Sequence, residues 1–171
     1  GYVTTGGVAY FAHEIKNAGK YGQAYIRFLN ADITQFDSLM PISHGQMATG
    51  TNAQTAQFAV VGQSPSDAVY DAPERHEGEV VLEVLNSTFH GIELNSSTNR
   101  YEMLWYVGGN VDATFSDVEI RDVRSYSAIY AANGANVTFD KLNATNVEGL
   151  NGGVASVDLC DLTVVRSSFT N

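Results

Sequence analysis

The sequence predicts an all-β protein: a right-handed parallel β-helix, a single-stranded solenoid with turns of about 24 residues and loop insertions. The first observation is that three segments align without gaps, Ala113–Val123, Val137–Val147 and Leu162–Asn171, and start 24 and 25 residues apart. Each opens with an apolar residue, threonine and another apolar residue. The second observation is that apolar or small residues alternate with polar ones inside each segment, which is typical of short strands.

The third observation is that two earlier segments, Ile26–Phe36 and Leu82–Ile92, fit the same template. The third place of the template then reads Phe28, Val84, Phe115, Phe139 and Val164. The eighth place reads Ile33, Phe89, Ile120, Ala144 and Phe169. The eleventh place reads Phe36, Ile92, Val123 and Val147. Stacked turns would bury these columns, because the same row of side chains recurs about 4.8 Å further along the axis.

Taken in order, the chain reads as one β-helix domain over residues 1–171, which we expect to be part of a longer chain. Gly6–Phe11 reads as a short strand, and residues 24–38 form the first template unit. Residues 39–79 hold all three prolines and read as a loop-rich insertion around one strand, Thr55–Val61. In the last units a second strand precedes the template by eight residues, which places Trp105, Ile129 and Val154 in one column.

Composition restricts the function. The net charge of −10 argues against nucleic acid or an anionic membrane surface as a partner. No apolar run of 18 residues is present, so we expect no membrane insertion. The single cysteine, Cys160, excludes a disulfide framework within the chain and aligns with Val111 and Ala135, so it is expected to be a core thiol.

Four Asn-X-Ser/Thr sequences favour a secreted, glycosylated protein, with unused sequons as the alternative. The candidate glycosylation sites are Asn86, Asn95, Asn136 and Asn143. Asn143 lies between the inward places of Leu142 and Ala144 and should therefore face outward.

Two stretches, Ser127–Phe139 and Gly152–Val157, resemble repeats of polymorphic outer-membrane-type proteins and other right-handed parallel β-helix surface proteins. Those repeats alternate a Gly-Gly-Ala-Ile-like strand with a Phe-x-x-Asn-like strand. Phe139–Asn143 is a loose match to the second and departs from it by one position. The resemblance implies an autotransporter-passenger-like helix exposed outside the cell that serves adhesion or structure.

The sequence contains few signs of catalysis. Glycoside hydrolysis needs two carboxylates facing one sugar, and Asp117, Glu119 and Asp122 are the nearest candidates. Asp122 shares its column with Asn and Gln residues, which favours hydrogen bonds along that column instead. The histidines have no metal-ligand spacing, and we expect no metal or cofactor. They are His13, His44, His76 and His90.

Two further columns of side chains are candidate contact surfaces. Tyr106 and Tyr130 lie 24 residues apart beside the inward Trp105 and Ile129, so they are expected to face outward as candidate surface-contact residues for a sugar or another protein. The alternative is that a loop covers them. The threonine column of Thr114, Thr138 and Thr163 has only three rows, too few for the flat array of an ice-binding face.

These observations favour a non-enzymatic structural or adhesive module at the cell surface. A polysaccharide-active lyase or hydrolase, or a carbohydrate-binding β-helix, is the alternative. The end at Asn171 falls within a template unit, with Phe169 in an inward column. An uncapped turn exposes a strand edge and an apolar row. We therefore expect either neighbouring turns of a longer chain or self-association, head to tail or lateral, into a repeating or filamentous assembly.

Overall fold

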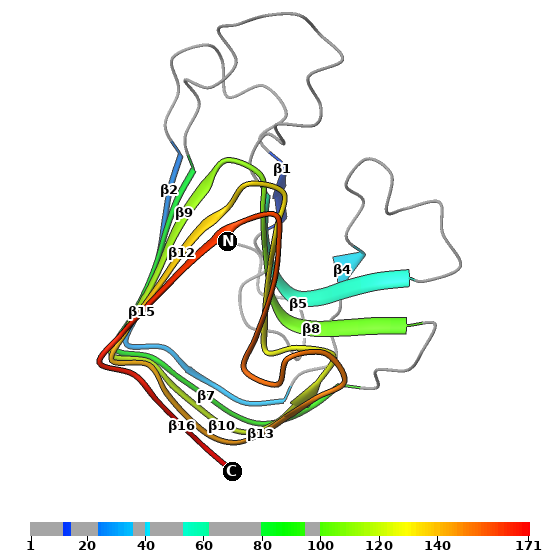
Figure 1. Ribbon diagram of the computed structural model, residues 1–171, viewed down its shortest axis with the longest axis vertical. Coiled ribbons are helices and arrows are strands. Elements are labelled where there is room, and N and C mark those ends of the chain that lie inside the picture. Colours follow the sequence, from blue (N-terminus) through cyan, green and yellow to red (C-terminus); the bar gives the residue numbers. More distant parts are fainter. Residues whose placement is uncertain (1–11, 15–23, 36–39, 42–52, 62–79, 95–99) are drawn as a thin grey trace, which may run out of the picture.

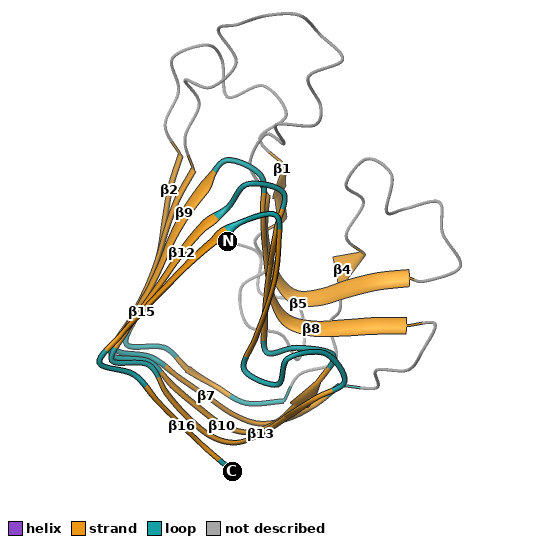
Figure 2. Ribbon diagram, viewed as in Figure 1, coloured by secondary structure: helices purple, strands orange, loops and turns teal. Residues whose placement is uncertain are grey.

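The computed structural model describes residues 12–14, 24–35, 40–41, 53–61, 80–94 and 100–171. Within these ranges the protein is all-β, with strands in three sheets and no helix (Figure 2). The prediction of an all-β chain is confirmed. The chain visits the three sheets in turn, and in Figure 1 the sheets form three sides of a roughly triangular outline.

Each sheet collects every third strand of the repeating part. Sheet A has the order β1 (Ala12–Glu14), β5 (Ala53–Val61), β8 (Arg100–Gly108), β11 (Ile129–Ala132) and β14 (Ala155–Asp158), with β4 (Met40–Pro41) on β5. Sheet B has the order β2 (Ala24–Leu29), β6 (Val80–Leu85), β9 (Val111–Ser116), β12 (Asn136–Asp140) and β15 (Asp161–Val165). Sheet C has the order β3 (Asp32–Ile33), β7 (Thr88–Glu93), β10 (Glu119–Ser125), β13 (Asn143–Gly149) and β16 (Ser168–Thr170).

All these pairs are parallel except β4 with β5, which is antiparallel. Parallel strands that stack in three sheets are compatible with the β-helix expected from the sequence. The region 39–79 contains β4 and β5, and β5 is a full member of sheet A between β1 and β8. The rest of that predicted insertion lies outside the described residues.

The predicted register of sheets B and C is confirmed for the described residues, whereas Phe36 of the eleventh-place column and the predicted strand Gly6–Phe11 lie outside them. The third-place column runs through sheet B from Phe28 to Val164, and the eighth-place column runs through sheet C from Ile33 to Phe169. Phe115, Phe139 and Ile120 are at most 1% exposed, as predicted. These inward rows place the apolar core between the three sheets.

The core is densest around Trp105, where side chains from all three sheets meet. Trp105 stacks on Phe58 of the neighbouring strand in sheet A, with ring centroids 4.5 Å apart and 19° between the ring planes. Its other ring contacts are edge-on, with Phe28 and Phe115 from sheet B and Phe89 from sheet C. Offset and edge-on aromatic pairs of this kind add specific packing energy to apolar burial.

Two details of the predicted packing are wrong. Ile129 pairs with Ala155 and not with Val154, so the template slips by one residue in sheet A. Val147 is only partly buried, although it was expected to be almost fully buried with the rest of its column. The reason is that β16 pairs with β13 only as far as Thr170, so no strand residue covers Val147 on that side.

The chain turns between sheets through residues with positive φ. At the corner from sheet B to sheet C one equivalent position has φ between 47° and 57° in every described circuit: Asn30, Asn86, Asp117, Lys141 and Arg166. A bend inside sheet C uses a second set, Gly91, Asp122 and Asn146. Glycine, asparagine and aspartate tolerate the left-handed conformation best, which explains much of this choice.

Candidate functional site

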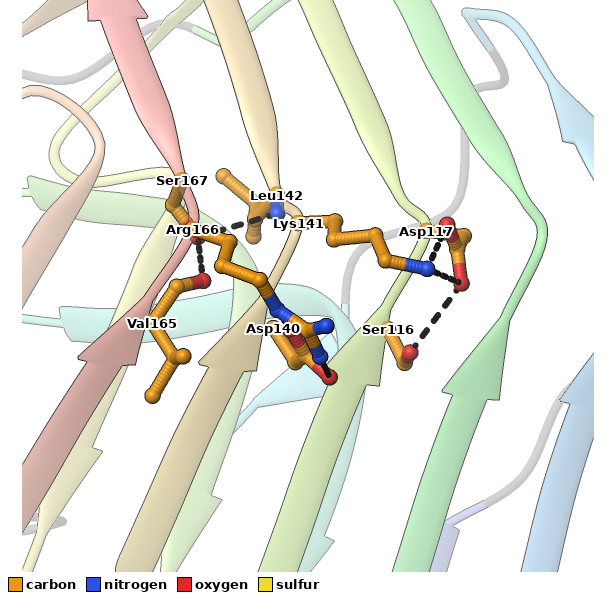
Figure 3. Close-up of polar contacts among 8 residues, drawn as sticks. All are labelled: Ser116, Asp117, Asp140, Lys141, Leu142, Val165, Arg166 and Ser167. Carbon is orange, nitrogen blue, oxygen red and sulfur yellow. Dashed lines mark hydrogen bonds and ion pairs between the residues drawn. The ribbon is translucent and has the colours of Figure 1, made fainter.

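The main polar site among the described residues is the B–C corner, and we call the stacked positive-φ residues there, with Asp140 beside them, the corner ladder. Lys141 Nζ lies 3.2 Å from Asp117 Oδ1 in the preceding circuit (Figure 3). Arg166 donates from Nε and Nη2 to the two carboxylate oxygens of Asp140, at 2.9 and 2.5 Å. The Asp140 carboxylate raises the pKa of Arg166. Opposite charges therefore join consecutive circuits along one edge of the molecule.

A buried or half-buried serine supports the same corner from inside. Ser167 Oγ donates to Val165 O at 3.0 Å and accepts the N–H of Leu142 in the preceding circuit at 3.0 Å. Ser87 does the same, donating to Leu85 O at 2.8 Å and accepting from Ala31 N at 3.1 Å. One hydroxyl thus closes its own turn and links it to the preceding circuit.

Asp117 and Asp122, two of the three carboxylates named as catalytic candidates, lie in separate columns. Asp117 belongs to the corner ladder, where it faces Lys141. Asp122 belongs to the bend inside sheet C and accepts a hydrogen bond from Asn146 Nδ2 at 2.7 Å. The hydrogen bonding predicted for the Asp122 column is confirmed for this pair. In these positions both carboxylates act in contacts between circuits.

The candidate glycosylation sites differ in how their amides are used. Asn86 Nδ2 donates to Asn30 Oδ1 at 2.7 Å, and Asn136 Nδ2 donates to Asp112 Oδ1 at 2.8 Å. Asn143 is exposed, as predicted, and its Oδ1 accepts from Ser168 Oγ at 2.7 Å. In N-glycosylation the sugar is attached to the Nδ2 atom. The Nδ2 atom of Asn143 takes no part in the hydrogen bond from Ser168. Asn95 lies outside the described residues.

The tyrosine column lies apart from the main core, on the other side from Trp105 and Ile129 as predicted, but it is buried and not an exposed contact surface. Tyr106 and Tyr130 do pair in register, and their rings stack with centroids 6.0 Å apart and 11° between the planes. Both are buried, however, in a second apolar cluster with Met103 and alanines of β5 and β11. The Tyr106 ring packs against Gly108, where an added Cβ atom would come within 2.7 Å of it. Burial raises the pKa of Tyr106, and raises the pKa of Tyr130 to about 12.

Two half-buried tyrosines that the sequence reasoning missed extend this cluster, which we call the outer tyrosine cluster: Tyr101, Tyr106, Tyr126 and Tyr130. The rings of Tyr101 and Tyr126 lie 4.2 Å apart between centroids, tilted by 35°. Asn151 Nδ2 donates to the Tyr126 hydroxyl at 3.1 Å. Tyr101, Tyr126 and Asn151 follow one another at steps of 25 residues, so the period of the chain could have found them.

The outer face of sheet B carries a further polar group. Arg27 pairs with Glu83 at 2.7 Å in the next circuit, and Tyr25 also donates to Glu83. Hydrogen bonds from Tyr25 and Arg27 lower the pKa of Glu83. Arg27 and Glu83 continue the column of Thr114 and its equivalents, which are aligned as expected.

The histidines are the candidate metal ligands of the chain, and Cys160 is its single thiol. His90 Nε2 lies 2.9 Å from Asp32 Oδ1, and His13 lies in β1, whereas His44 and His76 are outside the described residues. In the described ranges no group of three or more His, Cys, Asp or Glu side chains could hold a metal ion. Cys160 packs half-buried against the core as predicted, and burial raises the pKa of its thiol.

The chain matches no family model, and comparison with curated proteins and with solved structures finds no match either. A search of the described residues for a helix long and apolar enough to span a membrane also finds none.

Proposed function

We propose that the chain is a right-handed parallel β-helix that acts as a non-enzymatic structural or adhesive module outside the cell. The observation that carries the proposal is the parallel pairing of successive circuits in three sheets, with the inward columns of sheets B and C repeated from circuit to circuit. Connections between parallel strands of one sheet are right-handed as a general rule, which supports the handedness. A stack of this kind supplies length and a regular surface.

The outward residues support the same proposal. Charged side chains pair between circuits, as Asp117 does with Lys141, Arg124 with Glu93 at 3.6 Å, and Asp140 with Arg166. Exposed pairs of this type contribute only about 0–1 kcal/mol each, so their main effect is on register and surface charge. We propose that they hold the faces of the stack in a fixed pattern for lateral contacts.

The partner we propose is another turn of the same fold. Val164 and Phe169 occupy inward columns, yet they are 46% and 47% exposed, against 1% for Phe139 in the circuit before. An exposed apolar row above a strand edge favours association. The turn that covers it belongs either to the same polypeptide or to a second copy joined head to tail.

Sedimentation of the 171-residue chain tests the second case. Val164→Lys places a charge in the inward column, and Val165→Lys, its neighbour on the outer face of sheet B, is the matched control. We expect concentration-dependent self-association that Val164→Lys abolishes and Val165→Lys preserves. A monodisperse monomer for the unmodified chain would contradict head-to-tail assembly.

The extracellular location is tested by intact mass of the protein from its native source. We expect a glycan at Asn143, lost in Asn143→Gln, whereas Asn143→Gln would leave the mass excess unchanged if Asn86 or Asn136 carried the sugar. An unmodified mass would remove the main support for a glycosylated protein.

A second candidate function, carbohydrate binding, is favoured by the half-buried Tyr101–Tyr126 ring pair with the Asn151 amide beside it. Aromatic faces stack on sugar rings, and an adjacent amide can hydrogen-bond their hydroxyls. Tyr101→Ala should abolish binding to a panel of soluble glycans if this is the site, and Tyr25→Ala should not.

Steady release of reducing or unsaturated ends from polysaccharides, lost in Asp117→Asn or Asp122→Asn, would instead support an enzyme.

A further inference from the structure

Two asparagines of the chain precede glycine, and they occupy turns in consecutive circuits. Asn133–Gly134 connects β11 to β12, and Asn151–Gly152 lies in the turn between β13 and β14. In such a pair the backbone nitrogen of glycine can attack the side-chain carbonyl carbon of asparagine, because glycine has no side chain to obstruct the approach. Whether it does so in a folded protein depends on whether that nitrogen is free to move.

At the first pair the backbone nitrogen is held. Gly134 N–H donates to Leu159 O at 2.8 Å, and Asn133 N–H donates to Asp158 O at 3.1 Å, so both residues are tied to the following circuit. The turn is also closed by the N–H of Ala135, which donates to Ala132 O at 3.4 Å. Attack from Gly134 N therefore requires local opening of the turn.

At the second pair the nitrogen is not held in this way. The Asn151 N–H donates to Tyr126 O at 2.9 Å, so Asn151 is tied to a neighbouring circuit as Asn133 is, but among the backbone hydrogen bonds of the described residues the Gly152 N–H makes none. Asn151 is exposed, and its Nδ2 atom lies 3.1 Å from the hydroxyl of Tyr126 and 3.0 Å from Ser156 Oγ. In the folded chain the leaving amide donates to both hydroxyls, and either hydroxyl can give the departing nitrogen a proton once its O–H turns toward Nδ2.

We propose that Asn151–Gly152 is a self-modification site that converts to a succinimide and then, by reaction with water, to aspartate or isoaspartate. The bond between Gly152 N and Asn151 Cγ forms, and the bond from Cγ to Nδ2 breaks. The proton on Gly152 N passes to solvent, and the Tyr126 hydroxyl protonates the departing nitrogen, which leaves as ammonia. Water then returns a proton to Tyr126. Hydrolysis by a second water molecule opens the succinimide ring, so no oxidant or reductant is needed.

The two products have different effects on the fold. Aspartate at position 151 keeps the main chain and can accept hydrogen bonds from Tyr126 and Ser156. Isoaspartate adds a methylene to the main chain in a turn that has no spare room. A Cβ atom on Gly152 would lie 2.3 Å from Ala155 O, and one on Gly149 would lie 2.7 Å from Gly153 Cα. We therefore expect isoaspartate to loosen the start of β14 and the adjacent edge of the outer tyrosine cluster.

The test is incubation of the folded chain at neutral pH and moderate temperature, with samples mapped by mass spectrometry and isoaspartate assayed with an isoaspartate methyltransferase. We expect Asn151 to convert at least about tenfold faster than Asn133, a difference of about 1.4 kcal/mol in the activation barrier. Asn151→Gln should abolish the isoaspartate signal, and Asn133→Gln, the matched control, should leave it unchanged. Equal rates at the two asparagines in the folded chain, or a faster rate at Asn133, would overturn the proposal.

The role of the hydroxyl is tested separately with Tyr126→Phe. A positioned proton donor accelerates a reaction by about 10²–10⁴-fold, and because Ser156 can substitute for it we expect a slowing on the order of tenfold. The chain unfolded in denaturant is the reference, because there the change should have no effect. An unchanged rate at Asn151 in folded Tyr126→Phe would remove Tyr126 from the mechanism, and slowing in the unfolded chain would show an effect unrelated to the turn.

Discussion

Sheets A and B are built from the same succession of circuits, but their outer faces have different environments. In β9 of sheet B, buried and half-buried residues alternate along the strand. In β8 of sheet A every residue from Glu102 to Gly108 is buried, and all four residues of β11 are buried as well. Sheet B therefore has one face in the core and one toward solvent, whereas the middle of sheet A is covered on both faces.

The difference explains why sheet A holds two apolar clusters. Its inward side chains, led by Trp105, join the core between the three sheets. Its outward side chains, led by Tyr106, form a second cluster with Met103 and Tyr130. Parallel sheets are generally buried on both faces, so sheet A is the typical case and the one-sided sheet B is the exception. We expect substitutions on the outer faces of the two sheets to differ accordingly in cost.

The largest effect is expected in the shared core. Phe139→Ala should lower the free energy of unfolding by about 3–5 kcal/mol, as for other buried phenylalanines, because it leaves a cavity under sheet B. Thr138→Ala, one residue earlier on the outer face of the same strand, should change it by no more than about 0.5 kcal/mol. Urea unfolding followed by circular dichroism measures both. Equal costs for the two would show that the register of sheet B is wrong.

The next effect tests the outer face of sheet A. Tyr106→Ala should cost about 2–3 kcal/mol, toward the lower end for large buried side chains, because removing the ring also removes a desolvated hydroxyl. Tyr25→Ala is the control on the outer face of sheet B, where Tyr25 is 53% exposed. Its loss should cost much less than the loss of Tyr106, because exposed side chains contribute little. If both tyrosines cost the same in urea unfolding, the two outer faces are equivalent and the comparison fails.

The same difference decides how much of the fold the sequence predicts. Columns such as Phe115 with Phe139 could be read because polar residues separate them along each strand of sheets B and C. In β8 and β11 no polar residue marks the outward positions, so the outward side of Tyr106 could be inferred but its burial could not. Burial there depends on a partner cluster from β5, far away in the sequence.

The candidate site was predictable to a similar degree. The hydrogen bond between Asp122 and Asn146 follows from residue type and period alone. The positive φ of Lys141 and Arg166 does not, because long basic side chains have no special preference for that conformation. Contacts with neighbouring circuits fix the backbone conformation of Lys141 and Arg166, and these contacts are tertiary information.

A smaller effect is expected at the bend of sheet C, which borders solvent as the outer face of sheet B does. Asn146→Ala places a Cβ-bearing residue without a polar side chain at φ 53° and removes the hydrogen bond to Asp122. It should lower the unfolding free energy by about 1–2 kcal/mol. Asn146→Gly loses the same hydrogen bond but tolerates the backbone angle, and should cost less in the same assay. A larger loss for glycine would show that the backbone angle is not the cause.

The smallest effect concerns ionisation in the outer tyrosine cluster. Burial raises the pKa of Tyr130 from the ordinary value of 10.0 to about 12, because the charged phenolate loses its hydration there. The folded state therefore binds the phenolic proton more tightly than the unfolded state does. The stability that Tyr130 contributes through this proton is complete below pH 10 and is lost as the pH rises through about 12.

An absorbance titration of tyrosinate checks this, with urea unfolding repeated across the same alkaline range. We expect Tyr130 to ionise only near pH 12, and Tyr130→Phe to lower the amplitude of the late phase by one tyrosine, while Tyr106, whose pKa burial also raises, remains. The same variant should make the fall of stability between pH 10 and 12 less steep, since one group that links folding to proton binding is gone. Tyr126→Phe, on the half-buried side of the cluster, is the control and should leave the late phase in place. If the amplitude of the phase near pH 12 is unchanged in Tyr130→Phe, Tyr130 does not contribute to it, and the contrast between the two outer faces must rest on Tyr106 alone.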